Sequence, residues 1–178
     1  MTKANGPLFD VHFRRRREGR TNYVKRLALL KSGLPRLVVR KLNKGVLVQL
    51  VKYSMKGDET ICQASSSELE GFGFAGKRNV PSAYLAGFLL GKKAVAKGVS
   101  DFVADFGLHT ASKGGVLFAA VKGAVDGGLK TNVGQEMLPS EQRMAGKHIG
   151  LDISGALEKI KSGAVSVVIA NRKSNPIK

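Results

Sequence analysis

The sequence predicts an α/β domain of three layers, in which helices cover a mixed β-sheet. Two patterns predict this class. Three short segments rich in β-branched residues follow one another between residues 36 and 64, and the tight turns between them are typical of an antiparallel meander. A strand-like segment, a helix and a second strand-like segment then follow between residues 101 and 133. That order is typical of a parallel pair with a right-handed crossover.

The first 20 residues are predicted to form a basic arm. Four adjacent arginines, residues 14–17, would leave no apolar face for a core, whether the run were helical or extended. The guanidinium fork matches phosphate oxygens two at a time, which suits a polyanionic partner. A merely solvated arm explains the run equally well. Residues 21–31 are predicted to form a helix capped by Thr21, with Tyr23, Leu27 and Leu30 docked on the core.

The meander is predicted from strands at 36–40, 46–51 and 60–64, with turns at 42–45 and 56–58. Residues 71–76 contain the pattern G-x-G-x-x-G, but neither a strand directly before it nor a helix directly after it is predicted. We therefore expect a flexible surface loop there, and no dinucleotide cofactor.

A buried helix is predicted at 81–97, a strand at 101–106, a helix at 116–125 and a strand at 129–133. The loop 107–115 is either a phosphate site at a helix N-terminus or a plain loop with Ser112 as the cap. Two further helices, 139–147 and 151–161, and a strand-like segment, 164–170, complete the chain. The predicted division is an arm (1–20), a core (21–134) and a helical C-terminal extension with a possible extra strand (135–178).

Charge is the strongest functional signal. The chain has 178 residues, 43% of them hydrophobic, and a net charge of +17. Residues 1–52 hold 14 Lys and Arg against two acidic residues. This surplus points first to nucleic acid and second to an anionic membrane. With no Trp and 6% aromatic residues, recognition of shape and phosphate is favoured over base stacking. The single cysteine, Cys62, excludes an internal disulfide and fits a reducing compartment.

Catalytic chemistry is not expected. The histidines, residues 12, 109 and 148, have no partners at metal-ligand spacing, so neither a metal nor a cofactor is predicted. Nucleophile-elbow and P-loop motifs are absent. Two alternatives to a structural RNA-binding protein remain. One is a metal-dependent nuclease that uses Asp101 and Asp105, which share a face of one predicted strand. The other is a basic RNA chaperone without specificity.

Several long motifs occur in one order. They are Phe13–Tyr23, Pro35–Lys41, Ala83–Leu85, Val121–Leu129 and Gly146–Ile149. Over residues 8–150 the chain resembles the archaeal form of the 5S rRNA-binding protein family of the large ribosomal subunit (large-subunit protein eighteen), which has a longer eukaryotic relative. Two positions depart from the family pattern: Thr110-Ala111 replaces Arg-Pro, and Tyr23-Val24 replaces Tyr-Tyr.

The resemblance implies a structural protein of the cytoplasmic ribosome, with ribonuclease-H-like topology but without that enzyme's active site. It implies binding to 5S rRNA and attachment of 5S rRNA to the large-subunit rRNA in the central protuberance, beside the other universal 5S-binding protein. It also implies rRNA contacts from the following residues: Arg14, Arg15, Arg16, Arg17, Arg20, Lys25, Arg26, Arg40, Lys41, Asn43, Lys44, His109 and Lys113.

Overall fold

The computed structural model describes residues 6–162 and contains one four-stranded mixed sheet in the order β3-β2-β1-β4. The strands are β1 (Arg36–Lys41), β2 (Val46–Lys52), β3 (Glu59–Ser65) and β4 (Val103–Asp105). β2 pairs antiparallel with both β1 and β3, and β4 pairs parallel with β1. The α/β class, the mixed sheet and the antiparallel meander are therefore confirmed, but the parallel pair of the sheet joins β4 to β1 and not to residues 129–133.

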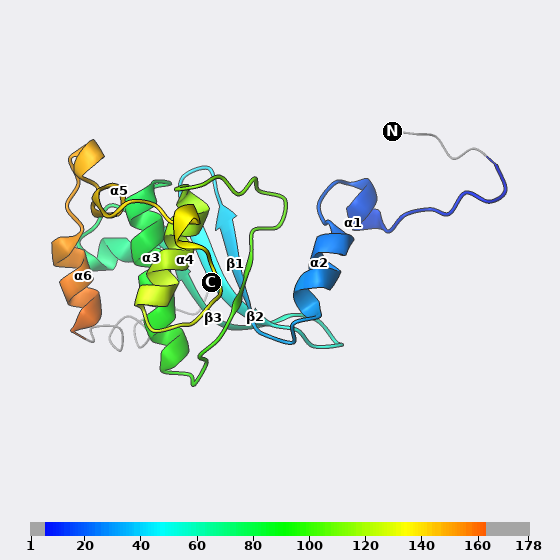
Figure 1. The fold of residues 1–178 in the computed structure, drawn as a ribbon, viewed down its shortest axis with the longest axis horizontal. Coiled ribbons are helices and arrows are strands. Elements are labelled where there is room, and N and C mark those ends of the chain that lie inside the picture. The colour runs from blue at the N-terminus through cyan, green and yellow to red at the C-terminus, as the bar shows by residue number, and fades with distance from the viewer. Residues whose placement is uncertain (1–5, 163–178) are drawn as a thin grey trace, which may run out of the picture.

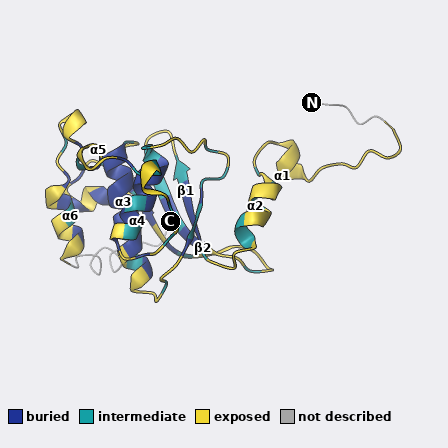
Figure 2. Cartoon of the chain, viewed as in Figure 1, coloured by how far each residue is buried: buried dark blue, intermediate teal, exposed yellow. Residues whose placement is uncertain are grey.

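The two faces of the sheet differ in polarity because side chains alternate along each strand. On one face, Leu37, Val48 and Leu50 are fully buried, and the helices α3 (Val80–Val95) and α4 (Val116–Asp126) cover them (Figures 1 and 2). The opposite face carries Arg36 and Asp105, which pair with each other. One face of the sheet therefore packs in the core, and the other face carries paired charges.

Glycines let α3 and α4 pack backbone against backbone. A Cβ added at Gly87 would lie 2.0 Å from the Ala120 carbonyl oxygen, and one at Gly123 would lie 2.1 Å from the Tyr84 carbonyl oxygen. This close approach packs the two helices tightly against each other on one face of the sheet. Among the described residues, none of the helices has the length and apolar character needed to cross a bilayer.

The segment after β3 differs from the expected surface loop. Residues 66–72 form the 3₁₀ helix η1 (Ser66–Phe72), and the side chains of Phe72 and Phe74 are buried. A Cβ at Gly76 would lie 1.6 Å from the Ser66 carbonyl oxygen, so this glycine allows the chain to fold back on η1. The prediction of a flexible loop was wrong because the two phenylalanines anchor the segment in the core.

The C-terminal part of the described chain consists of short helices, of which α5 and α6 lie beside α3 (Figure 1). They are η2 (Gln135–Met137), α5 (Glu141–Ala145), η3 (Lys147–Ile149) and α6 (Ser154–Lys161). Ile160 of α6 is 1% exposed, so α6 docks on the domain. Both predicted helices of the extension are confirmed in shorter form, and the predicted strand at 164–170 lies outside the described residues.

The N-terminal helices lie to one side of the core (Figure 1). They are α1 (Arg14–Arg17) and α2 (Tyr23–Leu30), and neither has a buried residue. The N-cap of α2 is Asn22, whose side chain accepts a hydrogen bond from the backbone amide of Lys25. The prediction of Thr21 as the cap was therefore wrong. The predicted docking of Leu27 was also wrong, because its side chain is 58% exposed. The nearby sheet face carries Arg36 and Asp105, and an open groove separates it from α2.

Two further expectations need correction. The predicted strand at 129–133 is reduced to a single parallel bridge between Asp101 and Lys130. Of the three expected layers, the sheet and α3/α4 are closely packed, whereas α2 stands off the charged face of the sheet. The space between α2 and that face is an open groove.

Candidate nucleic-acid interface

An open groove of about 810 Å³ separates the charged face of the sheet from α2 and from the loop after β4. Its walls come from segments far apart in sequence: the arm, α2, all four strands, the β2–β3 turn and residues 106–111. The positively charged side chains that line it are Arg15, Arg20, Lys25, Arg26, Arg36 and Arg40. The acidic side chains of the same lining are Asp58 and Asp105. The groove is therefore a concave surface with an excess of cations.

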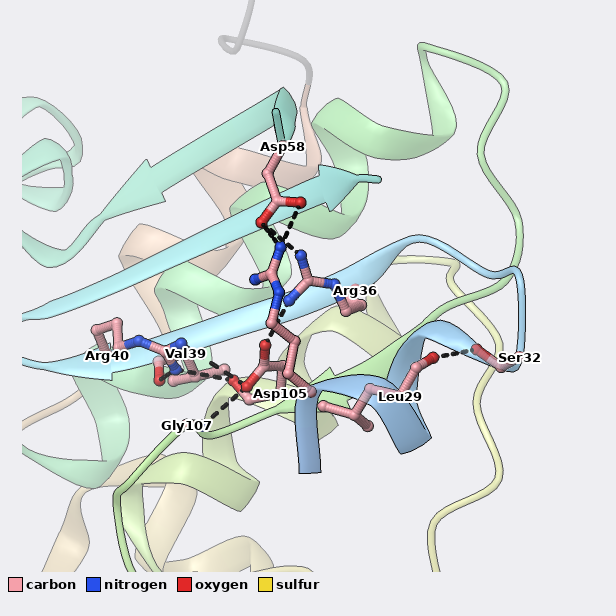
Figure 3. A network of polar contacts seen from close by, with 9 residues as sticks. Leu29, Ser32, Arg36, Val39, Arg40, Asp58, Asp105 and Gly107 are labelled. Carbon is pink, nitrogen blue, oxygen red and sulfur yellow. Dashed lines mark hydrogen bonds and ion pairs between the residues drawn. The ribbon is translucent and has the colours of Figure 1, made fainter. Parts of the chain in front are cut away.

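A chain of ion pairs forms the floor of the groove (Figure 3). Arg36 of β1 is 2% exposed, and its Nη1 lies 2.8 Å from Oδ2 of Asp105 on the neighbouring parallel strand. Its Nη2 lies 2.7 Å from Oδ2 of Asp58 in the β2–β3 turn. Its Nε has no hydrogen-bond partner among the described residues. Buried charges need partners, and two carboxylates satisfy most of this guanidinium.

The same network reaches both walls of the groove. Arg26 of α2 donates from Nη2 to both carboxylate oxygens of Asp58, at 2.9 and 2.8 Å. Burial alone would raise the pKa of Asp58, but hydrogen bonds from Arg26 and Arg36 outweigh it and hold that pKa below its ordinary value. On the other side, Arg40 Nη1 donates to the Asp105 carbonyl oxygen at 3.0 Å. Three arginines thus share two acidic residues.

Both carboxylate oxygens of Asp105 are engaged by groups of the protein. Its Oδ2 accepts a hydrogen bond from Arg36, and its Oδ1 accepts one from the Gly107 amide at 2.8 Å and faces Arg40 at 3.7 Å. Asp101 lies before β4, is exposed, and accepts a hydrogen bond from Ser100. Within residues 6–162 no three His, Cys, Asp or Glu residues gather where they could hold a metal ion. The structure therefore removes the geometric basis of the nuclease alternative.

The predicted RNA contacts fall into two groups. Those that line the groove are Arg15, Arg20, Lys25, Arg26, Arg40 and His109. Those that lie outside it are Arg14, Arg16, Arg17, Lys41, Asn43, Lys44 and Lys113. Arg16 lines a smaller hollow with Tyr23 and Leu108. Asn43 and Lys44 are exposed at the tip of the β1–β2 turn, and Lys113 is exposed in the loop before α4.

Comparison with known proteins gives this chain a family. Residues 8–104 match the family described as ribosomal large subunit proteins 60S L5, and 50S L18. A large ribosomal subunit protein uL18 from Methanoregula boonei is 49% identical over 147 residues, which cover 82% of this chain and 84% of that protein. Another uL18, from Thermofilum pendens, is 50% identical over 147 residues, which cover 82% of this chain and 75% of that protein.

The chain belongs to this family of large-subunit ribosomal proteins. The family is one of ribosomal proteins and not of enzymes, as the sequence predicted. The matched span holds the arm, α2 and all four strands except Asp105. Most of the groove is therefore built from the matched span, whereas Asp105 and the wall at residues 106–111 follow it.

The variant Asp105→Asn tests whether Asp105 stabilises the fold or takes part in RNA cleavage. A buried arginine that loses an anionic partner is left partly uncompensated, so we expect a loss of about 3 kcal/mol in the free energy of unfolding, measured with urea. Neither the wild type nor the variant should cleave RNA when Mg²⁺ or Mn²⁺ is added. Cleavage by the wild type that disappears in a folded variant would restore the nuclease alternative.

His109 also lines the groove, but its side chain brings little positive charge. Burial, and then the nearby cations Lys41 and Arg40, lower its pKa below the ordinary value of 6.5. Its Nε2 accepts a hydrogen bond from the backbone amide of Lys41 at 3.3 Å. The imidazole is therefore neutral at pH 7 in this family member, and any RNA contact it makes is not that of a cation.

A pH titration checks this assignment. Because the folded pKa of His109 is lowered, the unfolded chain takes up the proton first, and the stabilising contribution is complete above pH 6.5 and is lost as pH falls below it. The effect should stay below about 1 kcal/mol because water screens a partly exposed ring. We expect an NMR midpoint below 6.5 for His109, and a weaker acid dependence of stability in His109→Gln. A midpoint above 6.5 would contradict it.

Sequence reasoning missed two residues of the groove and misplaced a cap. Arg36 was treated as part of a strand, although it lies four residues before Arg40 and hence on the same face. That spacing was the available signal. No local signal pointed to Asp58, because its partners are 22 and 32 residues away. In the loop before α4, the N-cap is Gly115 and not Ser112.

Proposed function

We propose that this chain is a structural constituent of the large ribosomal subunit in the cytoplasm, and that it binds 5S rRNA through the groove and the adjacent arm. The observation that carries the proposal is the convergence of six Lys and Arg side chains on one concave face of a ribosomal-family protein. Phosphate contacts supply much of the affinity of such surfaces, and guanidinium groups bind phosphate oxygens in pairs. A double-stranded or folded RNA that lies in the protein groove would bring its backbone phosphates close to the cations of both groove walls.

Shape recognition fits this groove better than base stacking does. Its lining holds one aromatic side chain, Phe106, whose ring packs against Phe118 with centroids 5.2 Å apart. We therefore infer that the groove binds the sugar–phosphate backbone of a folded RNA and that base-specific contacts are few. Arginines 14, 16 and 17 lie just outside the groove and extend the charged surface along the RNA.

The finer assignment also follows from the family resemblance. We propose that the chain attaches 5S rRNA to the large-subunit rRNA in the central protuberance, next to the other universal 5S-binding protein. We further propose ribonuclease-H-like topology. The order β3-β2-β1-β4, with an antiparallel meander followed by a strand parallel to β1, supports it. The predicted boundaries of arm, core and extension stay part of this proposal.

Parallel binding titrations test the proposal. Full-length protein is titrated with 5S rRNA and with tRNA at several salt concentrations. We expect 5S rRNA to bind at least about 100-fold more tightly, which corresponds to roughly 2.7 kcal/mol, and to keep most of that margin at high salt. Equal binding that falls steeply with salt for both RNAs would show that charge alone acts, as in a chaperone without specificity.

A further inference from the structure

Helix α2 has no fully buried residue, and Leu29 and Leu30 are half-buried, so its apolar packing on the domain is slight. None of its residues is buried, and the side chain of Leu27 is mostly in solvent. Within residues 6–162, the one ion pair between α2 and the rest of the domain joins Arg26 to Asp58. Both oxygens of that carboxylate accept hydrogen bonds from the same Nη2 atom, at 2.9 and 2.8 Å. Among the described residues, Asp58 is thus the one acidic side chain that ties α2 to the rest of the domain.

Asp58 is itself held in place from below. Arg36 Nη2 donates to its Oδ2 at 2.7 Å, and Arg36 is fixed in the sheet by Asp105. The Asp58 side chain is 28% exposed, so it sits at the junction between the buried floor and the open groove. Figure 3 shows the Asp58 carboxylate above the labelled Arg36 of the strand below it. Asp58 therefore offers α2 a rigid attachment point at the end of the β2–β3 turn.

We propose that Asp58 is a positioning residue of the RNA-binding surface, and that it holds α2 and the arm over the groove before RNA arrives. This inference rests on the proposed function, because it assumes that the groove binds RNA phosphates. The attachment keeps Arg15, Arg20 and Lys25 in the lining of the same groove as Arg40. An acidic residue within a basic groove then strengthens RNA binding, although its own charge repels phosphate.

The balance between the two effects favours attachment. Removal of one carboxylate relieves the repulsion of nearby phosphates, a long-range effect that salt screens. Removal also frees a helix and several long cationic side chains, which must then be ordered when RNA binds. Because several side chains are affected together, we expect the ordering effect to exceed the charge effect and to weaken binding about tenfold.

A matched pair of variants tests this. Asp58→Asn and Glu59→Gln each remove one negative charge at adjacent positions, but Glu59 is exposed and takes part in no ion pair with the described part of the chain. We expect Asp58→Asn to bind 5S rRNA about tenfold more weakly than Glu59→Gln, mainly through faster dissociation. Asp58→Glu should recover part of the loss, because it restores a carboxylate.

Amide hydrogen exchange reports on the attachment without any RNA. In Asp58→Asn, the amides of α2 should exchange faster than in wild type, whereas those of α3 should not change. If Asp58→Asn binds 5S rRNA as tightly as Glu59→Gln, with unchanged α2 exchange, the proposal is wrong. If the wild type fails to prefer 5S rRNA over tRNA, the proposed function fails instead, and the exchange result still decides whether Asp58 holds α2.

A second pair keeps the test decisive if Asp58→Asn unfolds the domain. Arg26→Gln and Lys25→Gln remove the same charge from adjacent positions of one exposed helix, but of the two only Arg26 contacts Asp58. Faster α2 exchange in Arg26→Gln than in Lys25→Gln supports the proposal. Equal exchange in the two variants overturns it.

Discussion

Replacement of Arg14, Arg15, Arg16 and Arg17 by alanine should weaken binding to 5S rRNA by on the order of 100-fold at roughly 0.15 M salt, with no change in melting temperature. The four side chains are fully outside the core, since α1 has no buried residue. Removal of each phosphate contact lowers the salt slope of log K by about 0.7–0.9, so we expect the slope to fall by roughly 3. Binding titrations at several salt concentrations measure both quantities.

A charge-matched control separates the arm from charge in general. Lys77, Arg78, Lys147 and Lys161 are exposed and do not line the groove, and their replacement removes the same four charges. This control should lose only a small part of the affinity and little of the preference for 5S rRNA over tRNA. Equal losses in both quadruple variants would indicate binding by overall charge. A drop in melting temperature of the arm variant would instead assign α1 a structural role.

Gly87→Ala and Gly123→Ala should each destabilise the domain by about 3 kcal/mol or more. A methyl group added at Gly87 would meet the Ala120 carbonyl oxygen at 2.0 Å, and one added at Gly123 would meet the Tyr84 carbonyl oxygen at 2.1 Å. Neither obstacle is a flexible side chain, so α3 and α4 must separate and the core between them must repack. Urea unfolding gives the change in the free energy of unfolding.

Gly155→Ala is the matched control for helix propensity. Gly155 lies in α6, and an added Cβ would meet no atom within 4 Å. Alanine favours a helix over glycine by about 1 kcal/mol, so this variant should be as stable as the wild type or slightly more stable. If Gly87→Ala were equally harmless, the close approach of α3 and α4 would not contribute to stability.

Local patterns in the sequence were sufficient for the strands and the main helices. The β-branched residues of 36–40 and 46–51 and the Asn-Lys-Gly turn between them predicted a hairpin, because strand propensity and turn chemistry act over a few residues. The apolar period of 116–125 predicted the buried face of α4, and Leu117, Ala120, Val121 and Ala124 are indeed buried. The charge of the arm likewise needed no tertiary information.

Other features depend on partners distant in sequence. The segment 71–76 was predicted as a loop, and only the fold shows Phe72 and Phe74 entering the core. Leu27 was expected to dock, but the surface next to α2 is charged because Arg36 and Asp105, 69 residues apart, meet there. The alternative that gave Asp105 a catalytic role fails for the same reason, since its pairing with Arg36 is visible only in the folded chain.

The sequence alone determined the fold class, the basic arm and the resemblance to a ribosomal family, because composition, periodicity and motif order are properties of the chain itself. The tertiary structure alone decided which cations share one groove and which carboxylates hold them. Arg26, Arg36 and Asp58 meet only because the β2–β3 turn lies beside α2. Ion pairs of this kind are set by distances of a few ångströms, which sequence separation does not encode.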